Sequence, residues 1–83
     1  MKMKVYRVIS IIGSKENIIF ETEPFAENDG DADFDSYKKA RRALDKHCMG
    51  LFAKGYTVMS DGSYRHIEKN INAGYIELIL CTK

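Results

Sequence analysis

A single segment of this 83-residue chain has the periodicity of an amphipathic helix, and strand-like segments lie on both sides of it. Apolar side chains recur in it at three- and four-residue spacing, which predicts one buried helical face. They are Tyr37, Ala40, Leu44, Cys48 and Leu51. Asp35 or Ser36 can cap the start of this helix, and Gly55 can end it. One helix must therefore cover a whole sheet.

Five other segments are rich in β-branched and aromatic residues. They are residues 5–12, 18–23, 56–59, 64–69 and 75–82. Turn-forming sequences join the first two segments and, at Asp61-Gly62, the third and fourth, so each pair predicts an antiparallel hairpin. Because the first and last segments are the most apolar, we expect them side by side in the middle. The predicted fold is α+β, a ββαβββ two-layer sandwich with an antiparallel five-stranded sheet in the order 2-1-5-4-3 and one helix packed on one face.

The length of the chain limits its domain count and its core. Eighty-three residues fit one domain, residues 1–83, which buries about 60 to 65% of its unfolded surface. No apolar run approaches the ~18 residues that cross a bilayer, and the first residues lack the features of a signal peptide. We therefore expect a soluble, cytoplasmic protein that binds no membrane.

Residues for catalysis or for binding a cofactor are scarce. Cys48 and Cys81 match no metal or redox spacing, and no glycine-rich phosphate loop or nucleophile elbow is present. His47 adjoins Cys48, but neighbouring helical side chains point about 100° apart and do not form a catalytic pair. We expect no enzyme activity, no metal site and no cofactor.

The sheet face away from the helix carries large apolar residues. In the last strand Ile76, Leu78 and Leu80 share one face, which we expect to meet the helix. In the first strand both alternating sets mix apolar and polar residues, so the face that it buries stays open. The opposite face of the sheet would then gather Ile9, Ile11, Tyr75 and Ile79. Twist, long Lys and Arg stems and a neighbouring loop could partly cover them. Alternatively, this face is an interface for another protein or for a homodimer.

An acidic segment precedes the predicted helix. Residues 26–33 are polar and without periodicity, which predicts a mobile loop, and its acids include Asp29, Asp31 and Asp33. Specific calcium binding is disfavoured, because an EF-hand register puts Phe34 at the required glycine and Ala40 at the bidentate glutamate. The loop either docks on a basic partner or serves solubility.

Basic residues on the helix suggest an alternative function. Lys39, Arg42 and Lys46 recur at helical spacing away from the apolar face and, together with Arg65 and Lys69, could contact nucleic-acid phosphates. A net charge of +1 and the adjacent acidic segment argue against this, and a solvated helix face is the simpler interpretation.

These observations favour a small non-catalytic protein-binding domain of the inhibitor or adaptor type. It would act through the exposed sheet face and the acidic loop, with Ile9, Ile11, Tyr75, Ile79, Asp29, Asp31 and Asp33 as contacts, or would homodimerise through that face. We expect the partner to be another protein, either basic or a nucleic-acid enzyme. The size of the chain is also compatible with a phage or mobile-element accessory protein. A nucleic-acid-binding module that uses the basic helix is the alternative.

Overall fold

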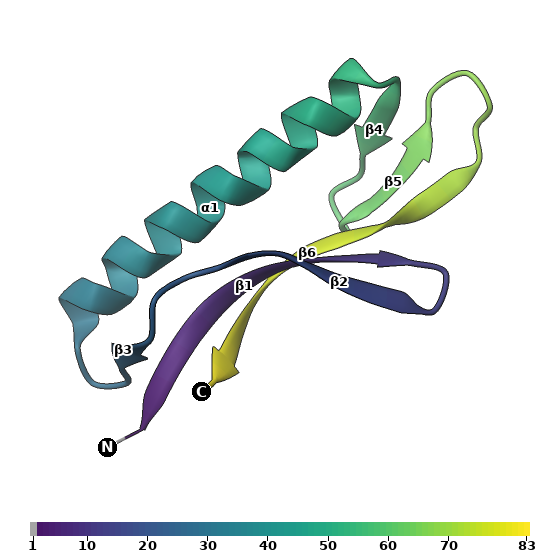
Figure 1. Ribbon diagram of the computed structural model, residues 1–83. Coiled ribbons are helices and arrows are strands. Elements are labelled where there is room, and N and C mark those ends of the chain that lie inside the picture. Colours follow the sequence, from purple (N-terminus) through teal and green to yellow (C-terminus); the bar gives the residue numbers. More distant parts are fainter. Residues whose placement is uncertain (1) are drawn as a thin grey trace.

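The computed structural model describes residues 2–83, which form one helix packed against a six-stranded antiparallel sheet (Figure 1). The elements are β1 (Met3–Ile12), β2 (Lys15–Glu21), β3 (Phe25–Ala26), α1 (Gly30–Ala53), β4 (Tyr56–Val58), β5 (Ser63–His66) and β6 (Asn72–Thr82). The sheet order is β2-β1-β6-β5-β4, and the short strand β3 pairs with β1 beside this path. The α+β prediction is confirmed, and the predicted five-strand order is extended by β3.

The two longest strands, β1 and β6, form the centre of the sheet. They pair antiparallel, with Val8 opposite Leu78 and Ser10 opposite Ile76. Residues directly opposite one another share a face, so Val8 and Ile76 point to the same side, where both belong to the core under α1. Both hairpins form as predicted, β1 with β2 and β4 with β5.

The helix begins earlier than the sequence predicts. Asp29 is its N-cap, and the Asp29 carboxylate accepts a hydrogen bond from the amide of Ala32 at 3.1 Å. Asp31 and Asp33 then lie in the first turn, where their charges complement the helix dipole. The loop predicted over residues 26–33 is therefore limited to residues 27–29, because residue 26 lies in β3 and residues 30–33 are helical. The predicted cap at residue 35 or 36 is wrong. The acids that suggested a solvated loop are the residues that favour a helix start.

The helix ends as the sequence predicts, and its apolar face meets the sheet. Lys54 is the C-cap, and Gly55 follows with φ +93°, a left-handed conformation that favours glycine. Ala40 is fully buried, while Leu44, Cys48 and Leu51 pack against the core and remain partly exposed. Tyr37 lies at the margin, where its ring meets the edge of Tyr6 at 5.6 Å between centroids.

The core is thin because the domain is elongated. The radius of gyration is 14.2 Å, against about 12 Å expected for a compact chain of this length. Seven apolar residues of the described chain are buried, namely Val5, Val8, Ile9, Phe25, Ala40, Tyr64 and Ile76. In Figure 1 the helix runs obliquely along one side of a strongly twisted sheet, so it does not cover the full length of every strand. Parts of the helix-facing sheet surface consequently stay open to solvent.

Candidate binding cleft

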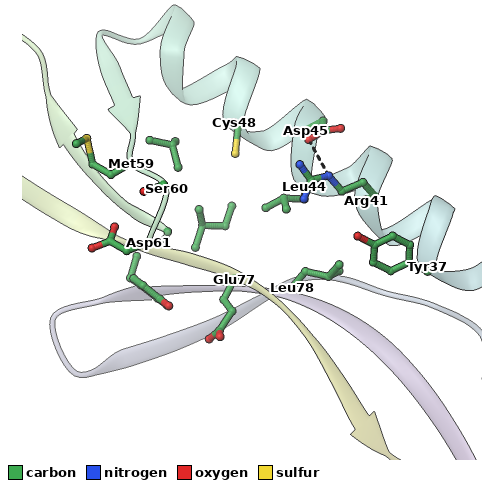
Figure 2. Close-up of a pocket in the computed structure, with 14 residues that line it drawn as sticks. Tyr37, Arg41, Leu44, Asp45, Cys48, Met59, Ser60, Asp61, Glu77 and Leu78 are labelled. Atoms are coloured by element: carbon green, nitrogen blue, oxygen red, sulfur yellow. Dashed lines mark ion pairs between the residues drawn. The ribbon is translucent and has the colours of Figure 1, made fainter.

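An open cleft of about 620 Å³ lies between α1, the β4–β5 turn and β6. Figure 2 shows Leu44 and Cys48 extending from the helix into it, with Ser60 and Asp61 on the turn across from them. The cleft exists because the helix and the turn approach the sheet from two sides. Its location is fixed by elements that lie far apart in the sequence.

The floor of the cleft is apolar. Five of its residues belong to the core or pack against it, namely Leu44, Cys48, Val58, Ile76 and Leu78. Leu44, Val58 and Leu78 are only partly buried. The cleft therefore exposes core surface directly to solvent, which is the usual character of a ligand or partner site.

The wall formed by the turn depends on Gly62. Its φ is +94°, and a β-carbon at this position would lie 2.5 Å from the carbonyl oxygen of Ile76. The amide of Ile76 donates to the carbonyl of Gly62 at 2.8 Å. Only glycine allows this close approach of turn and strand, so Gly62 sets the distance between Asp61 and β6.

The rim of the cleft is charged. On the helix side Arg41 pairs with Asp45 at 3.5 Å between Nε and Oδ1, drawn as a dashed line in Figure 2. On the sheet side Asp61 and Glu77 add two carboxylates, and Glu77 points away from the helix in this view. Because the helix pair is internally balanced, the sheet side gives the cleft a negative character.

The turn holds the Asp61 carboxylate in its ionised form. It accepts hydrogen bonds from the hydroxyl of Ser63 at 2.7 Å and from the amide of Ser63 at 3.0 Å. These bonds lower the pKa of Asp61, with a smaller contribution from the positive charge of Arg65. Asp61 is thus a fixed negative charge at the edge of the cleft.

Cys48 in the cleft floor is a half-buried residue that packs against the core. Burial raises the pKa of its thiol, and the nearby Asp45 carboxylate acts in the same direction. The thiolate, which is the nucleophilic form, is disfavoured there. Across residues 2–83, no group of three or more His, Cys, Asp or Glu residues is arranged to hold a metal ion.

A second, smaller groove adjoins the cleft. Its volume is about 350 Å³, and its lining comprises Cys48, Met49, Phe52, Thr57 and Val58. Cys48 and Val58 line both hollows, so the two lie next to each other. Met49 is 73% and Phe52 69% exposed. The spacing of residues in the sequence could have indicated this groove. Asp45, Met49 and Phe52 are four and three residues apart, so they form a second stripe on the helix beside the predicted core face.

The predicted sheet-face residues share one side, but they are less exposed than expected. Ile11 lies opposite Tyr75, and Ile79 lies opposite Arg7, whose alternation along β1 places it on the side of Ile9. Ile9 is only 5% exposed, so the expectation that it is available for contact is wrong. Tyr75 is the predicted contact that also lines the cleft.

At the same face, an ion-pair network covers the end of the sheet near the termini. Arg7 pairs with Glu21 across β1 and β2, and Lys83 pairs with the same carboxylate at 3.4 Å. The bond to Arg7, with help from Lys83, lowers the pKa of Glu21. Val5 and Arg7 are two residues apart on β1, so their side chains lie on the same face of the sheet. Val5 is fully buried on that face.

Two of the three predicted acidic contacts have hydrogen-bond partners at the helix start. Asp29 caps α1, and the hydroxyl of Tyr6 donates a hydrogen bond to the Asp33 carboxylate. Asp31 is exposed in the first turn. These acids lie outside the cleft lining, so the structure does not bring them together with Tyr75 at one site.

The residues of the nucleic-acid alternative are divided between two sides of the sheet. Lys39, Arg42 and Lys46 are exposed on α1. Tyr64 is buried under the helix, and its neighbour Arg65 points to the other side, where it pairs with Thr57. Lys69 lies beyond β5, in the connection to β6. The structure therefore does not bring Arg65 to the side of the sheet that carries the helix residues.

No protein-family model, curated protein or solved structure matches this chain. In the part of the chain that the structure describes, no helix is long and apolar enough to cross a membrane.

Proposed function

We propose that this chain is a small non-catalytic protein-binding domain that holds a segment of a partner protein in the cleft and the adjoining groove. The observation that carries the proposal is core surface left open between α1 and the β4–β5 turn. Leu44, Val58 and Leu78 give it an apolar floor. Covering apolar surface of this kind with a partner lowers the free energy of the system and so favours binding.

The charges at the rim favour a basic partner. Asp61 and Glu77 stand on the sheet side of the cleft, while Arg41 is paired with Asp45. A cationic side chain near Asp61 and Glu77 would gain Coulomb energy, and the same charges would steer a basic partner during approach. Nucleic acid is a weaker candidate, because Lys39, Arg42 and Lys46 lie on α1 whereas Arg65 points to the far side of the sheet.

The test is a selection of short random peptides displayed on phage against the intact chain. Enriched peptides are then measured against Phe52→Ser in the groove and Glu77→Lys at the rim. Matched controls are Phe34→Ser, another exposed phenylalanine, and Glu68→Lys, an exposed acid outside the cleft lining. We expect both site variants to weaken binding and both controls to leave it unchanged. A selection without enrichment, or binding indifferent to the site variants, would contradict the proposal.

Light scattering addresses contact through the other sheet face. A homodimer that disappears in Ile79→Asp would place the interface there, because the new charge would be unpaired in a desolvated contact. We expect a monomer for the wild-type chain.

A further inference from the structure

The strand β4 is an edge of the sheet, and its unpaired backbone groups can be assigned. The amide of Ile67 donates to the carbonyl of Gly55 at 2.8 Å, and the amide of Met59 donates to the carbonyl of Ser63 at 2.7 Å. Backbone groups of an antiparallel strand alternate in direction, so Gly55, Thr57 and Met59 face β5. The N–H and C=O groups of Tyr56 and Val58 therefore point outward, to the side where the described sheet has no further strand.

The other edge of the sheet is protected, and β4 is not protected in the same way. The strand β2 carries Lys15, Glu16 and Glu21, and its pairing with β1 is interrupted by a bulge at Ile19. Charged side chains and bulges are the devices by which edge strands avoid pairing with other chains. The sequence of β4, Tyr-Thr-Val, has no charge, and no bulge interrupts its pairing with β5.

The open edge of β4 adjoins both hollows. Val58 lines the cleft and the groove alike, and Thr57 lines the groove together with Met49 and Phe52. A strand placed beside β4 would have apolar surface at the groove end and the acidic rim at Asp61 at the other. Backbone hydrogen bonds with side-chain hollows nearby are the combination used in recognition by strand addition.

We infer that the partner segment binds in an extended conformation, as an additional strand paired with Tyr56 and Val58, with a large apolar side chain against Met49 and Phe52 and a basic side chain near Asp61. This inference rests on the proposed function and specifies its binding mode. It assigns affinity to the segment's backbone and selectivity to its apolar and basic side chains.

Amide hydrogen exchange, read residue by residue by NMR on the wild-type chain with a phage-selected peptide, tests the binding mode. Strand addition predicts slower exchange at the Tyr56 and Val58 amides when the peptide is bound. The amide of Thr57 already faces β5 and serves as the internal control. The amides of β2 should not change.

N-methylation of single peptide amides gives a second measurement. Methyl groups on the amides that face β4 should weaken binding on the order of tenfold each, as expected for a lost hydrogen bond and a steric clash. Methyl groups on the alternate amides should have little effect. On the protein side, Val58→Pro removes an outward N–H without removing a bond to β5. This substitution also alters packing and can destabilise the fold. In that case the exchange measurement on the wild-type chain is the deciding test.

The outcomes separate this inference from the proposed function. Peptides that depend on Phe52 and Glu77 but leave Tyr56 and Val58 exchange unchanged would overturn strand addition and leave the binding domain in place. A selection without enrichment would overturn both. Protection of Tyr56 and Val58 in the peptide-free chain, together with a dimer in light scattering, would identify a second copy as the occupant and overturn the inference of a basic partner.

Discussion

The hydroxyl of Tyr6 donates a hydrogen bond to the carboxylate of Asp33 and so joins β1 to the first turn of α1. The rings of Phe25 and Tyr37 both pack against that of Tyr6, with centroids at 5.7 Å and 5.6 Å. One side chain thus links the central strand, β3 and the helix start. The contact fixes the end of the helix that is farthest from the β4 edge.

Removing this hydrogen bond should destabilise the fold. We expect Tyr6→Phe to lower the free energy of unfolding by about 1 kcal/mol, a value reduced by the partial exposure of the pair. Urea unfolding of Tyr6→Phe, Asp33→Asn and the double variant measures it. A double variant whose loss equals the sum of the single losses would show that the two side chains are not coupled.

The same bond predicts a loss of stability in alkali. The hydrogen bond to Asp33 and burial raise the pKa of Tyr6 from 10.0 to about 12. The folded state therefore favours the protonated phenol. Its contribution is complete below pH 10 and is lost as the pH rises from about 10 through 12. Unfolding midpoints measured across this range should fall less steeply for Tyr6→Phe than for the wild-type chain.

The N-cap gives a prediction for the helix start. Asp29→Ala should cost about 1 kcal/mol, because the amide of Ala32 loses its acceptor. Asp31→Ala is the matched control, since Asp31 lies in the first turn and contributes through its interaction with the helix dipole. Thermal unfolding followed by circular dichroism compares the two variants, and equal losses would argue against Asp29 as the cap.

The β4–β5 turn should not tolerate a side chain at Gly62. We expect Gly62→Ala to destabilise the protein by more than about 1 kcal/mol, because of its positive φ and the close carbonyl of Ile76. Gly30→Ala is the control, since a β-carbon at Gly30 meets nothing within 4 Å. Urea unfolding compares the two variants. Equal losses of stability would contradict the prediction.

Electrostatic steering gives a kinetic prediction for the cleft. Glu77→Lys should slow association with a basic phage-selected peptide, and the effect should shrink as salt is added. Stopped-flow association at low and high ionic strength measures it, with Glu68→Lys as the control. The same slowing in both variants would mean that net charge, rather than the cleft, guides the approach.

The sequence predicts local structure better than the site. Asp61-Gly62 marks its hairpin by turn chemistry, and the apolar strands at the two ends of the chain indicate the centre of the sheet. The start of α1 is missed because acidic residues are equally typical of a solvated loop and of a helix N-terminus, and only the position of Asp29 distinguishes them.

The cleft could not be predicted, because it depends on distances between elements rather than on periodicity. Leu44, Asp61 and Leu78 come from a helix, a turn and a strand that meet only in the folded chain. Alternation along β1 does not by itself choose a face, because both alternating sets mix apolar and polar residues. The sequence also does not reveal that Ile9 is buried on the face away from the helix.

The pairing of β1 with β6 has a consequence for folding kinetics. These strands form the centre of the sheet although nearly the whole described chain separates Val8 from Leu78. Closing so long a loop costs entropy before the pairing returns any stabilisation. The two hairpins and α1 need only local contacts, so we expect them to form early and transiently. Docking of β6 onto β1 then sets the folding rate, and until it occurs the apolar edges of both strands remain open to aggregation.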